Sequence, residues 1–377
     1  MARFSVTYWI GSKDEAEARA RAAEIALEQT VEIPADIVPE GYVRDEILGR
    51  VEDVAQASGQ RGGYFARISY SDDDIGDDFP QLLNIIFGNS SIRPDCRVES
   101  MTLSEGILAI CQGPRFGPDG LRKRTGMPDG PLLMSAIKPV GLPVAALADL
   151  AHRFALGGVN YIKDDHGLAN QKTSPFRERL RACTDAVGEA NAKTGGESLY
   201  VPNVTGPVEL ILERAFAAQE QGAGGVMLAP SLTGYEAARM LRARTDFNLP
   251  IISHPAFGGA NVITPTTGFS HAFFFGTLQR LMGVDAVVYP NFGGRFSFSR
   301  EECLSIVSGC SEPLDGLLPA MPTPGGGMTF ERIPEIVSTY GDDVMYLIGG
   351  ALLRQQDDLA GACRRLRDLL QNTNSGN

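Results

Sequence analysis

Short apolar runs alternate with longer amphipathic stretches at a regular spacing over residues 126–370. The apolar runs that predict strands lie at 132–138, 161–165, 199–203, 226–229, 251–254, 286–289, 318–322 and 345–348. Between them, stretches such as 143–156, 207–221, 235–244 and 330–339 carry apolar residues at helical spacing. Eight strand–helix units predict an α/β fold, a (β/α)8 TIM barrel. A doubly wound sheet fits less well, because no glycine fingerprint follows the first strand.

Residues 1–125 have a different pattern, which predicts a separate domain. We expect strands at 3–10, 63–70 and 107–110, and helices at 13–27 and 79–87. This order indicates the split βαβ arrangement of an α+β ferredoxin-like domain. The Gly- and Pro-rich segment 126–131 is typical of a linker. The expected domains are therefore 1–125 and 126–370, followed by a disordered polar tail at 371–377.

Composition and charge narrow the classes of partner. The chain has 377 residues, of which 43% are hydrophobic and 21% charged, as is typical of a globular protein. A formal net charge of −12 without a basic stripe argues against nucleic acid and anionic membranes as partners. An anionic small-molecule substrate stays compatible, because local backbone donors can outweigh a distant global charge. Six scattered cysteines without a CxxC pair, no signal peptide and no membrane-spanning apolar run predict a cytoplasmic protein.

The most unusual polar run follows the second predicted barrel strand. It reads Lys163-Asp164-Asp165-His166, and four adjacent ionisable groups are costly to bury. In (β/α)8 barrels the C-terminal strand ends carry the chemistry. Alternation places Lys163 and Asp165 on one face of the strand, and Asp164 and His166 on the other, until the strand ends. A lysine joins a metal site only when it is deprotonated or converted to a carbamate; the alternative is a surface loop of charge pairs.

Polar or glycine residues follow most of the other predicted strands. They are Lys138, Asn203, His254, Arg295, Gly325–Gly327 and Gly349–Gly350. The glycine runs after the seventh and eighth strands occupy the usual phosphate site of such barrels, where backbone N–H groups attract an anion. For each of these residues the alternative is a structural role. Lys138 would point to solvent, His254 would pack in the core and Asn203 would cap a helix. Arg295 would pair with Glu301 or Glu302, and the glycines would form tight turns.

Three segments, taken in order, resemble those of one family, RuBisCO and the RuBisCO-like proteins. They are CQGPRFG at 111–117, SAIKPVGL at 135–142 and GGVNYIKDDH at 157–166. The likeness spans nearly the whole chain, including the N-terminal domain. The resemblance implies that Lys138 handles protons at the reacting carbon and that Lys163 is carbamylated by CO₂ to bind Mg²⁺. It also implies that Asp165 and His166 are the other metal ligands.

The resemblance implies binding roles as well. Asn203 corresponds to a polar residue near the metal, and His254 to a histidine that lines the substrate. One phosphate site corresponds to Gly325, Gly326, Gly349 and Gly350. We expect Arg295, on the same rim, to bind the anionic substrate. Glu28 corresponds to a glutamate that the N-terminal domain offers to the active site of a partner subunit, which implies a homodimer or a dimer of dimers.

Several positions depart from the carboxylating members of the family. His166 replaces a glutamate ligand, which makes Mn²⁺ or Zn²⁺ alternatives to Mg²⁺. Pro255, Val288 and Pro324 replace three donors to the distal phosphate, and each lost charge-assisted bond is worth about 1.5–3 kcal/mol. The mobile lysine that closes over CO₂ is absent from 291–296. The chain therefore resembles type IV, the RuBisCO-like proteins that do not fix CO₂.

The expected function is that of an enzyme which forms a metal-stabilised enolate or enediolate. Its substrate is a small oxo-sugar or oxo-sugar acid with at most one phosphate. The favoured reaction is decarboxylation or C–C cleavage of a 3-oxo sugar acid, which makes the enzyme a lyase. One alternative is an enolase or isomerase that acts on a methylthio-ketose phosphate in sulfur salvage. A non-catalytic metabolite-binding barrel is another, and a true ribulose-bisphosphate carboxylase needs distal phosphate donors that the sequence lacks.

Overall fold

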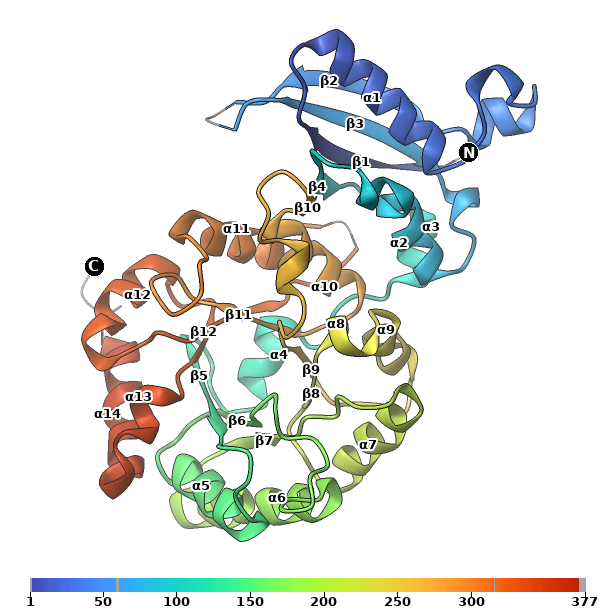
Figure 1. Ribbon diagram of the computed structural model, residues 1–377. Coiled ribbons are helices and arrows are strands. Elements are labelled where there is room, and N and C mark those ends of the chain that lie inside the picture. Colours follow the sequence, from blue (N-terminus) through green and yellow to red (C-terminus); the bar gives the residue numbers. More distant parts are fainter. Residues whose placement is uncertain (1, 59–60, 315, 373–377) are drawn as a thin grey trace. The chain divides into compact units, whose positions relative to one another are not determined.

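Two sheets organise the chain in the computed structural model, which describes residues 2–58, 61–314 and 316–372 (Figure 1). The first structural unit consists of Met1–Gln112, Gly258–Leu278 and Pro313–Leu317. The second consists of Gly113–Phe257, Gln279–Glu312 and Leu318–Asn377. The boundary expected at residue 125 falls within the second unit, because helix α4 (Gly117–Lys123) belongs to it.

The first unit contains a five-stranded sheet with the order β10-β4-β1-β3-β2. Its strands are β1 (Arg3–Ile10), β2 (Arg50–Gln56), β3 (Tyr64–Ser71), β4 (Cys96–Met101) and β10 (Gly268–Phe269). Its α-helices are α1 (Glu15–Glu28), α2 (Phe79–Phe87) and α3 (Glu105–Ile110). β1 pairs antiparallel with β3 and β4, β2 pairs antiparallel with β3, and β10 joins β4 in parallel. The order and pairing of β1 to β4 confirm the predicted ferredoxin-like fold.

Alternation along β1 explains how this sheet binds its helices. Phe4, Val6, Tyr8 and Ile10 are fully buried and lie on one face of the strand. The hydroxyl of Tyr8 donates a 2.7 Å hydrogen bond to the carbonyl of Ile86 in α2. α1 packs against β2 and β3. The apolar face of the sheet is thus covered by helices, as in other α+β sandwiches.

The strand expected at 107–110 is wrong, because these residues end helix α3. Ser104 accepts a hydrogen bond from the backbone N–H of Ile107 and caps a helix whose first turn contains Glu105. A four-residue apolar run fits a buried helix as well as a strand, and this cap favours the helix. The last strand of the pattern is instead β4. β2, which the sequence did not predict, is an edge strand with mostly exposed side chains.

The second unit contains an eight-stranded parallel sheet with the order β7-β6-β5-β13-β12-β11-β9-β8. Its strands are β5 (Leu132–Ile137), β6 (Tyr161–Asp164), β7 (Leu199–Val201), β8 (Val226–Leu228), β9 (Ile251–Ser253), β11 (Ala286–Pro290), β12 (Met321–Gly325) and β13 (Met345–Leu347). A parallel bridge between Asn203 and Met227 joins β7 to β8, the two edge strands of this order. The sheet thereby curls into a barrel. Every predicted barrel strand is present, and the largest difference is at β12, which was expected at 318–322.

Helices connect these strands and surround them (Figure 1). They are α5 (Val144–Leu156), α6 (Phe176–Thr194), α7 (Val208–Glu220), α8 (Pro230–Thr233), α9 (Glu236–Ala243), α10 (Leu278–Leu281), α11 (Arg300–Ser311), α12 (Ile333–Tyr340), α13 (Gly350–Leu353) and α14 (Leu359–Asn372). The alternation of strand and helix confirms the predicted (β/α)8 barrel.

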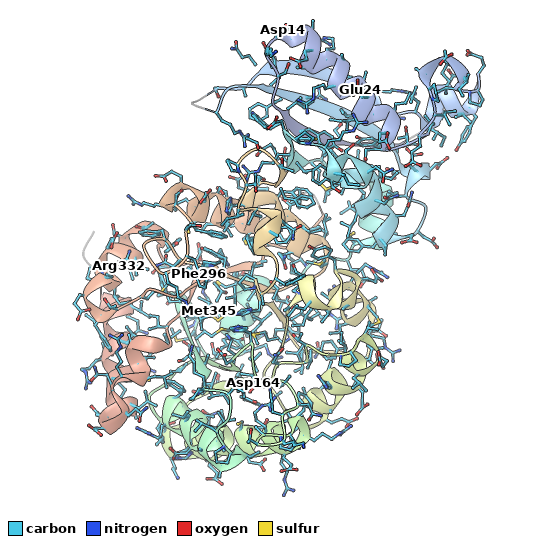
Figure 2. All side chains as sticks on the ribbon, viewed as in Figure 1. Asp14, Glu24, Asp164, Phe296, Arg332 and Met345 are labelled. Atoms are coloured by element: carbon cyan, nitrogen blue, oxygen red, sulfur yellow. The ribbon has the colours of Figure 1, made fainter. Side chains whose placement is uncertain are left out.

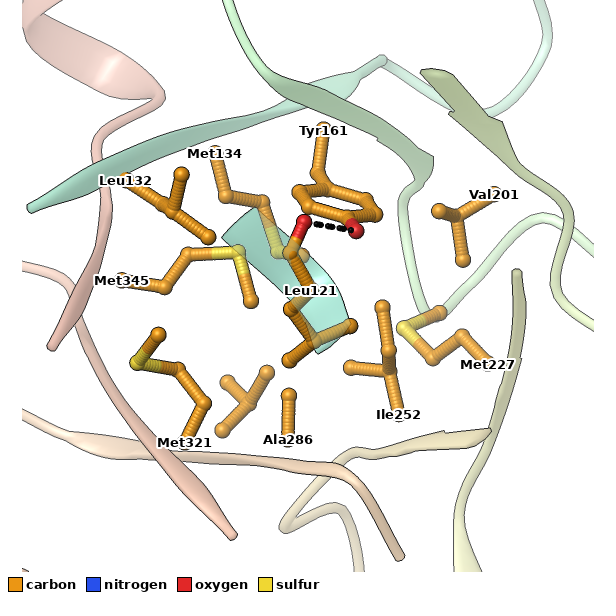
Figure 3. Packing of buried hydrophobic residues seen from close by; sticks show 11 residues of the cluster. Leu121, Leu132, Met134, Tyr161, Val201, Met227, Ile252, Ala286, Met321 and Met345 are labelled. Carbon is orange, nitrogen blue, oxygen red and sulfur yellow. Dashed lines mark hydrogen bonds between the residues drawn. The ribbon is translucent and has the colours of Figure 1, made fainter. Parts of the chain in front are cut away.

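A layer of apolar side chains fills the barrel interior (Figure 3). It contains Leu132, Met134, Tyr161, Val201, Met227, Ile252, Ala286, Val288, Met321 and Met345 from the strands, with Leu121 from α4. The hydroxyl of Tyr161 donates a 3.0 Å hydrogen bond to the carbonyl of Leu121. Five of the ten strand residues are the first of their strands, and Leu121 packs among them, so α4 closes the N-terminal end of the barrel. Polar chemistry is thereby confined to the opposite end.

The polar tail expected at 371–377 begins inside a helix, because α14 runs to Asn372. Residues 373–377 lie outside the described residues. Within the described part of the chain, no helix combines the length and the apolar character that a bilayer crossing requires. All six cysteines are buried and carry free thiols.

Candidate active site

Strand alternation brings six of the predicted site residues to one end of the barrel interior. In β5, Leu132 and Met134 belong to the interior layer, and the same register continues to Lys138 just beyond the strand. Every second residue after a member of the interior layer lies on the same face of its strand. Counted in this way, the residues that reach the C-terminal end of the barrel, here called the mouth, are Lys138, Lys163, Asp165, His254, Gly325 and Gly349. The period of the β-strand therefore accounts for their convergence.

Asp165 is the centre of a polar cluster at this mouth. Its Oδ1 lies 3.7 Å from Nζ of Lys138 and 3.7 Å from Nδ1 of His166. The His166 ring stacks on the His254 ring, with centroids 4.4 Å apart and 14° between the planes. The side chains of Lys138, Asp165 and His166 stay 37%, 20% and 48% exposed. A small molecule can therefore reach all three.

Lys163 lies deeper in the barrel and is only 2% exposed. Its Nζ donates a 3.0 Å hydrogen bond to the backbone carbonyl of Asp164. Burial lowers the pKa of Lys163 to about 8, while Asp165 raises it and Lys138 lowers it further. The share of uncharged amine at neutral pH is consequently larger than for an exposed lysine.

The surroundings of the two histidines of the cluster favour their neutral forms. Burial lowers the pKa of His254 to about 2, and Lys163 and His166 act in the same direction. Burial also lowers the pKa of His166. The backbone N–H of Ala256 donates a 3.2 Å hydrogen bond to Nδ1 of His254, which assigns the ring proton to Nε2. His254 can therefore donate to an oxygen atom, and a neutral His166 can ligate a metal ion.

Asp164, which is labelled in Figure 2, makes contacts different from those of this cluster. It is fully buried and accepts hydrogen bonds from the Arg179 guanidinium, the Tyr200 hydroxyl and the Asn203 backbone. As alternation predicts, it lies on the opposite face of β6 from Lys163. His166 does not share that face, because β6 ends at Asp164 and His166 lies in the following loop.

Asn203, expected near the metal or the substrate, is turned toward the loop between β6 and α6. Its Nδ2 donates to the carbonyls of His166 at 3.1 Å and Leu168 at 3.0 Å. Its Oδ1 accepts a 3.1 Å hydrogen bond from the backbone of Thr205. It does not cap α7, whose N-cap is Pro207. The Asn203 side chain, which is 1% exposed, therefore holds the loop that carries His166.

Two glycines of each run border a pocket of about 330 Å³ at the ends of β12 and β13, and Gly325 is not among its lining residues. Gly326, Gly327, Gly349 and Gly350 line it together with Arg354 and other residues of the two loops. A β-carbon built on Gly349 would lie 3.6 Å from Nζ of Lys138, so this lysine adjoins the glycine-lined wall. Gly326 and Gly327 have φ values of +87° and +68°, which other residues rarely adopt.

Arg332, which is labelled in Figure 2, joins the loop after β11 to the glycine-bearing loop after β12. Its Nη1 donates to the carbonyls of Gly293 at 3.1 Å and Gly327 at 3.2 Å. Arg295 lies in the loop after β11. It is exposed, and its guanidinium lies over the Phe296 ring. After burial and closer charges, Arg295 is a further cause of the lowered pKa of His166. The binding of an anionic substrate by Arg295 stays a prediction.

Glu28 is the last residue of α1 in the first unit. Its Oε1 accepts a 3.1 Å hydrogen bond from Asn89, and its Oε2 accepts a 3.4 Å hydrogen bond from Arg93. The side chain is 28% exposed. Glu28 thus takes part in a polar network of its own unit, and its place at a partner's active site stays a prediction.

Two of the predicted metal ligands have a geometry that fits one ion. Oxygen and nitrogen ligands bind Mg²⁺ or Zn²⁺ at about 2.0–2.2 Å, so two ligands of one ion lie at most about 4.4 Å apart. Oδ1 of Asp165 and Nδ1 of His166 meet this limit at 3.7 Å. Among the described residues, no group of three or more His, Cys, Asp or Glu side chains could hold a metal ion. A third ligand from the protein would be of another type, and carbamylated Lys163 stays the predicted one.

Four side chains that shape this region were not predicted: Arg179, Tyr200, Arg332 and Arg354. They come from helices, or from strand faces directed away from the barrel interior. A signal exists for Arg179, since an arginine on the buried face of an amphipathic helix requires an acidic partner. A signal also exists for Arg354, which follows Gly350 by one helical turn.

The fold and the cluster together define the class of protein. It is a (β/α)8 barrel with two lysines, a carboxylate, two neutral imidazoles and a glycine-lined pocket at the C-terminal mouth. This is an enzyme-like site suited to a small anionic molecule. The family model "Ribulose bisphosphate carboxylase large chain, catalytic domain" matches residues 119–377. The chain belongs to this family.

Similar proteins place the chain among the RuBisCO-like members, as the sequence predicted. It is 40% identical to Ribulose bisphosphate carboxylase-like protein 1 of Rhodopseudomonas palustris, over 95% of this chain and 94% of the relative. It is 38% identical to a 5-methylthioribulose-1-phosphate isomerase of Rhodospirillum rubrum, over 95% and 93%. A crystal structure of a Rubisco-like protein from Rhodopseudomonas palustris superimposes with a TM-score of 0.87 at 38% identity, covering 99% of this chain and 98% of that one.

Proposed function

We propose that this protein isomerises a small ketose monophosphate by way of an enediolate. The observation that carries the proposal is the place of Lys138. Its Nζ lies 3.7 Å from Asp165, a predicted metal ligand, and adjoins Gly349 of the glycine-lined pocket. An acid–base group between a cation site and an anion site suits proton transfer at a hydroxyl-bearing carbon next to the carbonyl of a phosphorylated ketose.

In this proposal, Lys163, Asp165 and His166 hold Mg²⁺, with Mn²⁺ or Zn²⁺ as alternatives. Lys163 takes part as a carbamate, which forms when its neutral amine adds CO₂ and releases a proton. When bound, the ion polarises the substrate carbonyl and stabilises negative charge on its oxygen. The carbamate replaces a positive charge by a negative one beside Asp165, which increases the attraction for a cation.

Lys138 removes the proton from the hydroxyl-bearing carbon next to the carbonyl and returns it to the former carbonyl carbon, while the hydroxyl proton passes to the former carbonyl oxygen. His254 donates its Nε2–H to an oxygen of the substrate, because its Nδ1 is already an acceptor for Ala256. The two groups divide the work: Lys138 moves the proton, and His254 orients the oxygen that gains charge.

One phosphate occupies the glycine-lined pocket. Backbone N–H groups of the two loops and the Arg354 guanidinium supply its donors. The distal phosphate site of carboxylating members has no equivalent here, because Pro255, Val288 and Pro324 offer no side-chain donor. These features favour a monophosphate and argue against ribulose bisphosphate.

The name of the Rhodospirillum rubrum relative supports a 5-methylthioribulose 1-phosphate type of substrate and an isomerase outcome. Phe257 and Phe296, which are 78% and 50% exposed, lie on loops after β9 and β11. They offer apolar surface for a thioether. Decarboxylation or C–C cleavage of a 3-oxo sugar acid stays a prediction that uses the same lysines.

The test is a substrate screen by NMR in D₂O. Purified protein with bicarbonate and Mg²⁺, Mn²⁺ or Zn²⁺ is incubated with 5-methylthioribulose 1-phosphate and, separately, with 3-oxo sugar acids. We expect deuterium exchange at the carbon next to the carbonyl and a new ketose phosphate signal. Release of CO₂ from a 3-oxo sugar acid, without deuterium exchange in the ketose phosphate, would contradict the proposed isomerase activity and support a decarboxylase activity.

A first mutational prediction concerns Arg354. Its side chain forms no hydrogen bond or ion pair within the described part of the chain, so it is available to a phosphate. We expect Arg354→Ala to raise KM for the ketose phosphate about tenfold and to change kcat less, because the lost contact binds the substrate and the transition state alike. Steady-state kinetics measure the split. Arg181→Ala, an arginine of α6 whose side chain is 78% exposed, is the control and should leave both constants unchanged.

A second prediction concerns Glu28 and a homodimer. If Glu28 completes the site of a partner subunit, Glu28→Gln and Lys163→Ala should each be inactive alone. Mixed and allowed to exchange subunits, they should recover about one quarter of the wild-type activity, because half of the dimers are hybrids with one intact site of two. Light scattering verifies the dimer. A monomer with full activity, or no recovery after proven exchange, would contradict the prediction.

A further inference from the structure

A buried carboxylate lies one residue away from the predicted metal ligands and is saturated with donors. Nε of Arg179 lies 3.2 Å from Oδ1 and 3.1 Å from Oδ2 of Asp164, and Nη2 lies 3.1 Å from Oδ2. The hydroxyl of Tyr200 donates to Oδ1 at 2.6 Å, and the backbone of Asn203 donates to Oδ2 at 2.9 Å. The side chains of Asp164 and Arg179 are both 0% exposed.

The same groups hold the loop between β6 and α6. Arg179 donates to the carbonyls of Ala169 at 2.8 Å and Ser174 at 2.6 Å. Asn203, whose backbone binds Asp164, donates through its side chain to the carbonyl of His166 at 3.1 Å. The network therefore fixes this loop at both of its ends. Asp165 and His166 lie at the end that follows β6.

Stability alone is a weak reason for such a network. A buried ion pair gains little over an apolar pair of similar volume, because removal of both charges from water offsets their attraction. Metal ligands, by contrast, need fixed orientations, and the groups that supply them change metal affinity when they are altered. The hydrogen bonds from Asn203 to His166, and from Arg179 along the loop, supply that orientation.

We propose that Asp164 and Arg179 are positioning residues of the metal site, an inference that rests on the site of the proposed function. They do not touch the ion or the substrate. The Asp164 carboxylate fixes Arg179 and Asn203, and these fix the backbone on which Asp165 and His166 are carried. Loss of the carboxylate charge frees the Arg179 guanidinium, and the two ligands lose their common geometry.

The test measures Mn²⁺ binding to the full chain in bicarbonate buffer by electron paramagnetic resonance. We expect Asp164→Asn to raise the Kd for Mn²⁺ by about 10–100-fold and to change the spectrum of the bound ion. Asp285→Asn is the matched control. Asp285 is 1% exposed and accepts backbone hydrogen bonds from Phe116 and Ile251, but it precedes β11 at the closed end of the barrel. We expect this variant to lower Tm without a change in Mn²⁺ affinity.

Wild-type Mn²⁺ affinity in Asp164→Asn would overturn the proposal, as would equal losses in both variants. If Asp164→Asn does not fold, Tyr200→Phe removes a single donor to Asp164. A smaller but measurable weakening of Mn²⁺ binding then supports the proposal, and unchanged binding overturns it. Because the readout is ion binding, a wild type that binds Mn²⁺ but fails the isomerase assay defeats the proposed function alone.

Discussion

Lys163→Met is expected to abolish turnover and divalent metal binding together while the protein stays folded. The methionine keeps the apolar stem that packs in a site only 2% exposed, and it removes the amine. Without that amine no carbamate forms, and Asp165 and His166 are left as two ligands. Loss of a Lewis acid worth several kcal/mol corresponds to a fall in kcat of about 1,000-fold or more.

Two measurements besides activity check this expectation. In ¹³C-labelled bicarbonate, the wild type should show a carbamate carbonyl signal by NMR that Lys163→Met lacks. Electron paramagnetic resonance should show bound Mn²⁺ in the wild type only. Lys172→Ala is the control. Lys172 is an exposed lysine in the loop between β6 and α6, and this variant should match the wild type in both measurements. A carbamate signal or tight Mn²⁺ binding in Lys163→Met would remove this lysine from the metal site.

The barrel was predictable from the sequence because its strands are buried on both faces. Runs such as 286–289 are apolar throughout, and their spacing repeats. The positions of the strand ends were less accurate, since they depend on the backbone hydrogen bonds between neighbours. β12 shows this: it runs to Gly325, past two prolines that make it a weak strand in isolation.

The first unit was harder to predict. β2 is an edge strand in which Val54 is the one buried residue, so its sequence carries no apolar run. The run at 107–110 is apolar but belongs to a helix, because Ser104 caps it. An apolar run indicates that a segment is buried. Short helices and short strands can both be buried, so the run does not distinguish between them.

The residues at the barrel mouth were predictable because a strand has a period of two. Once Leu132 and Tyr161 face the interior, Lys138 and Lys163 must follow on the same side. No such period predicts the contacts of side chains that point from the barrel strands toward the surrounding helices. The pairing of Asp164 with Arg179 joins a strand to the following helix, and nothing in the spacing alone fixes it.

Lys138 separates proton transfer from metal binding, and its replacement is the second large effect that we expect. Lys138→Met should lower kcat by about 10²–10⁴-fold, the usual contribution of a positioned acid–base group. Deuterium exchange of the substrate in D₂O should fall in parallel. Mn²⁺ affinity should stay equal or increase, because a positive charge 3.7 Å from Oδ1 of Asp165 is removed.

A second variant distinguishes a proton carrier from a mere positive charge. Lys138→Arg keeps the cation beside Asp165, but a guanidinium does not give up its proton at neutral pH. If Lys138 moves the proton, the arginine variant is as slow as the methionine variant although its Mn²⁺ affinity matches the wild type. Substantial exchange in Lys138→Arg would instead make Lys138 an electrostatic group. The base would then have to be sought among the carbamate of Lys163 and the other groups around Asp165.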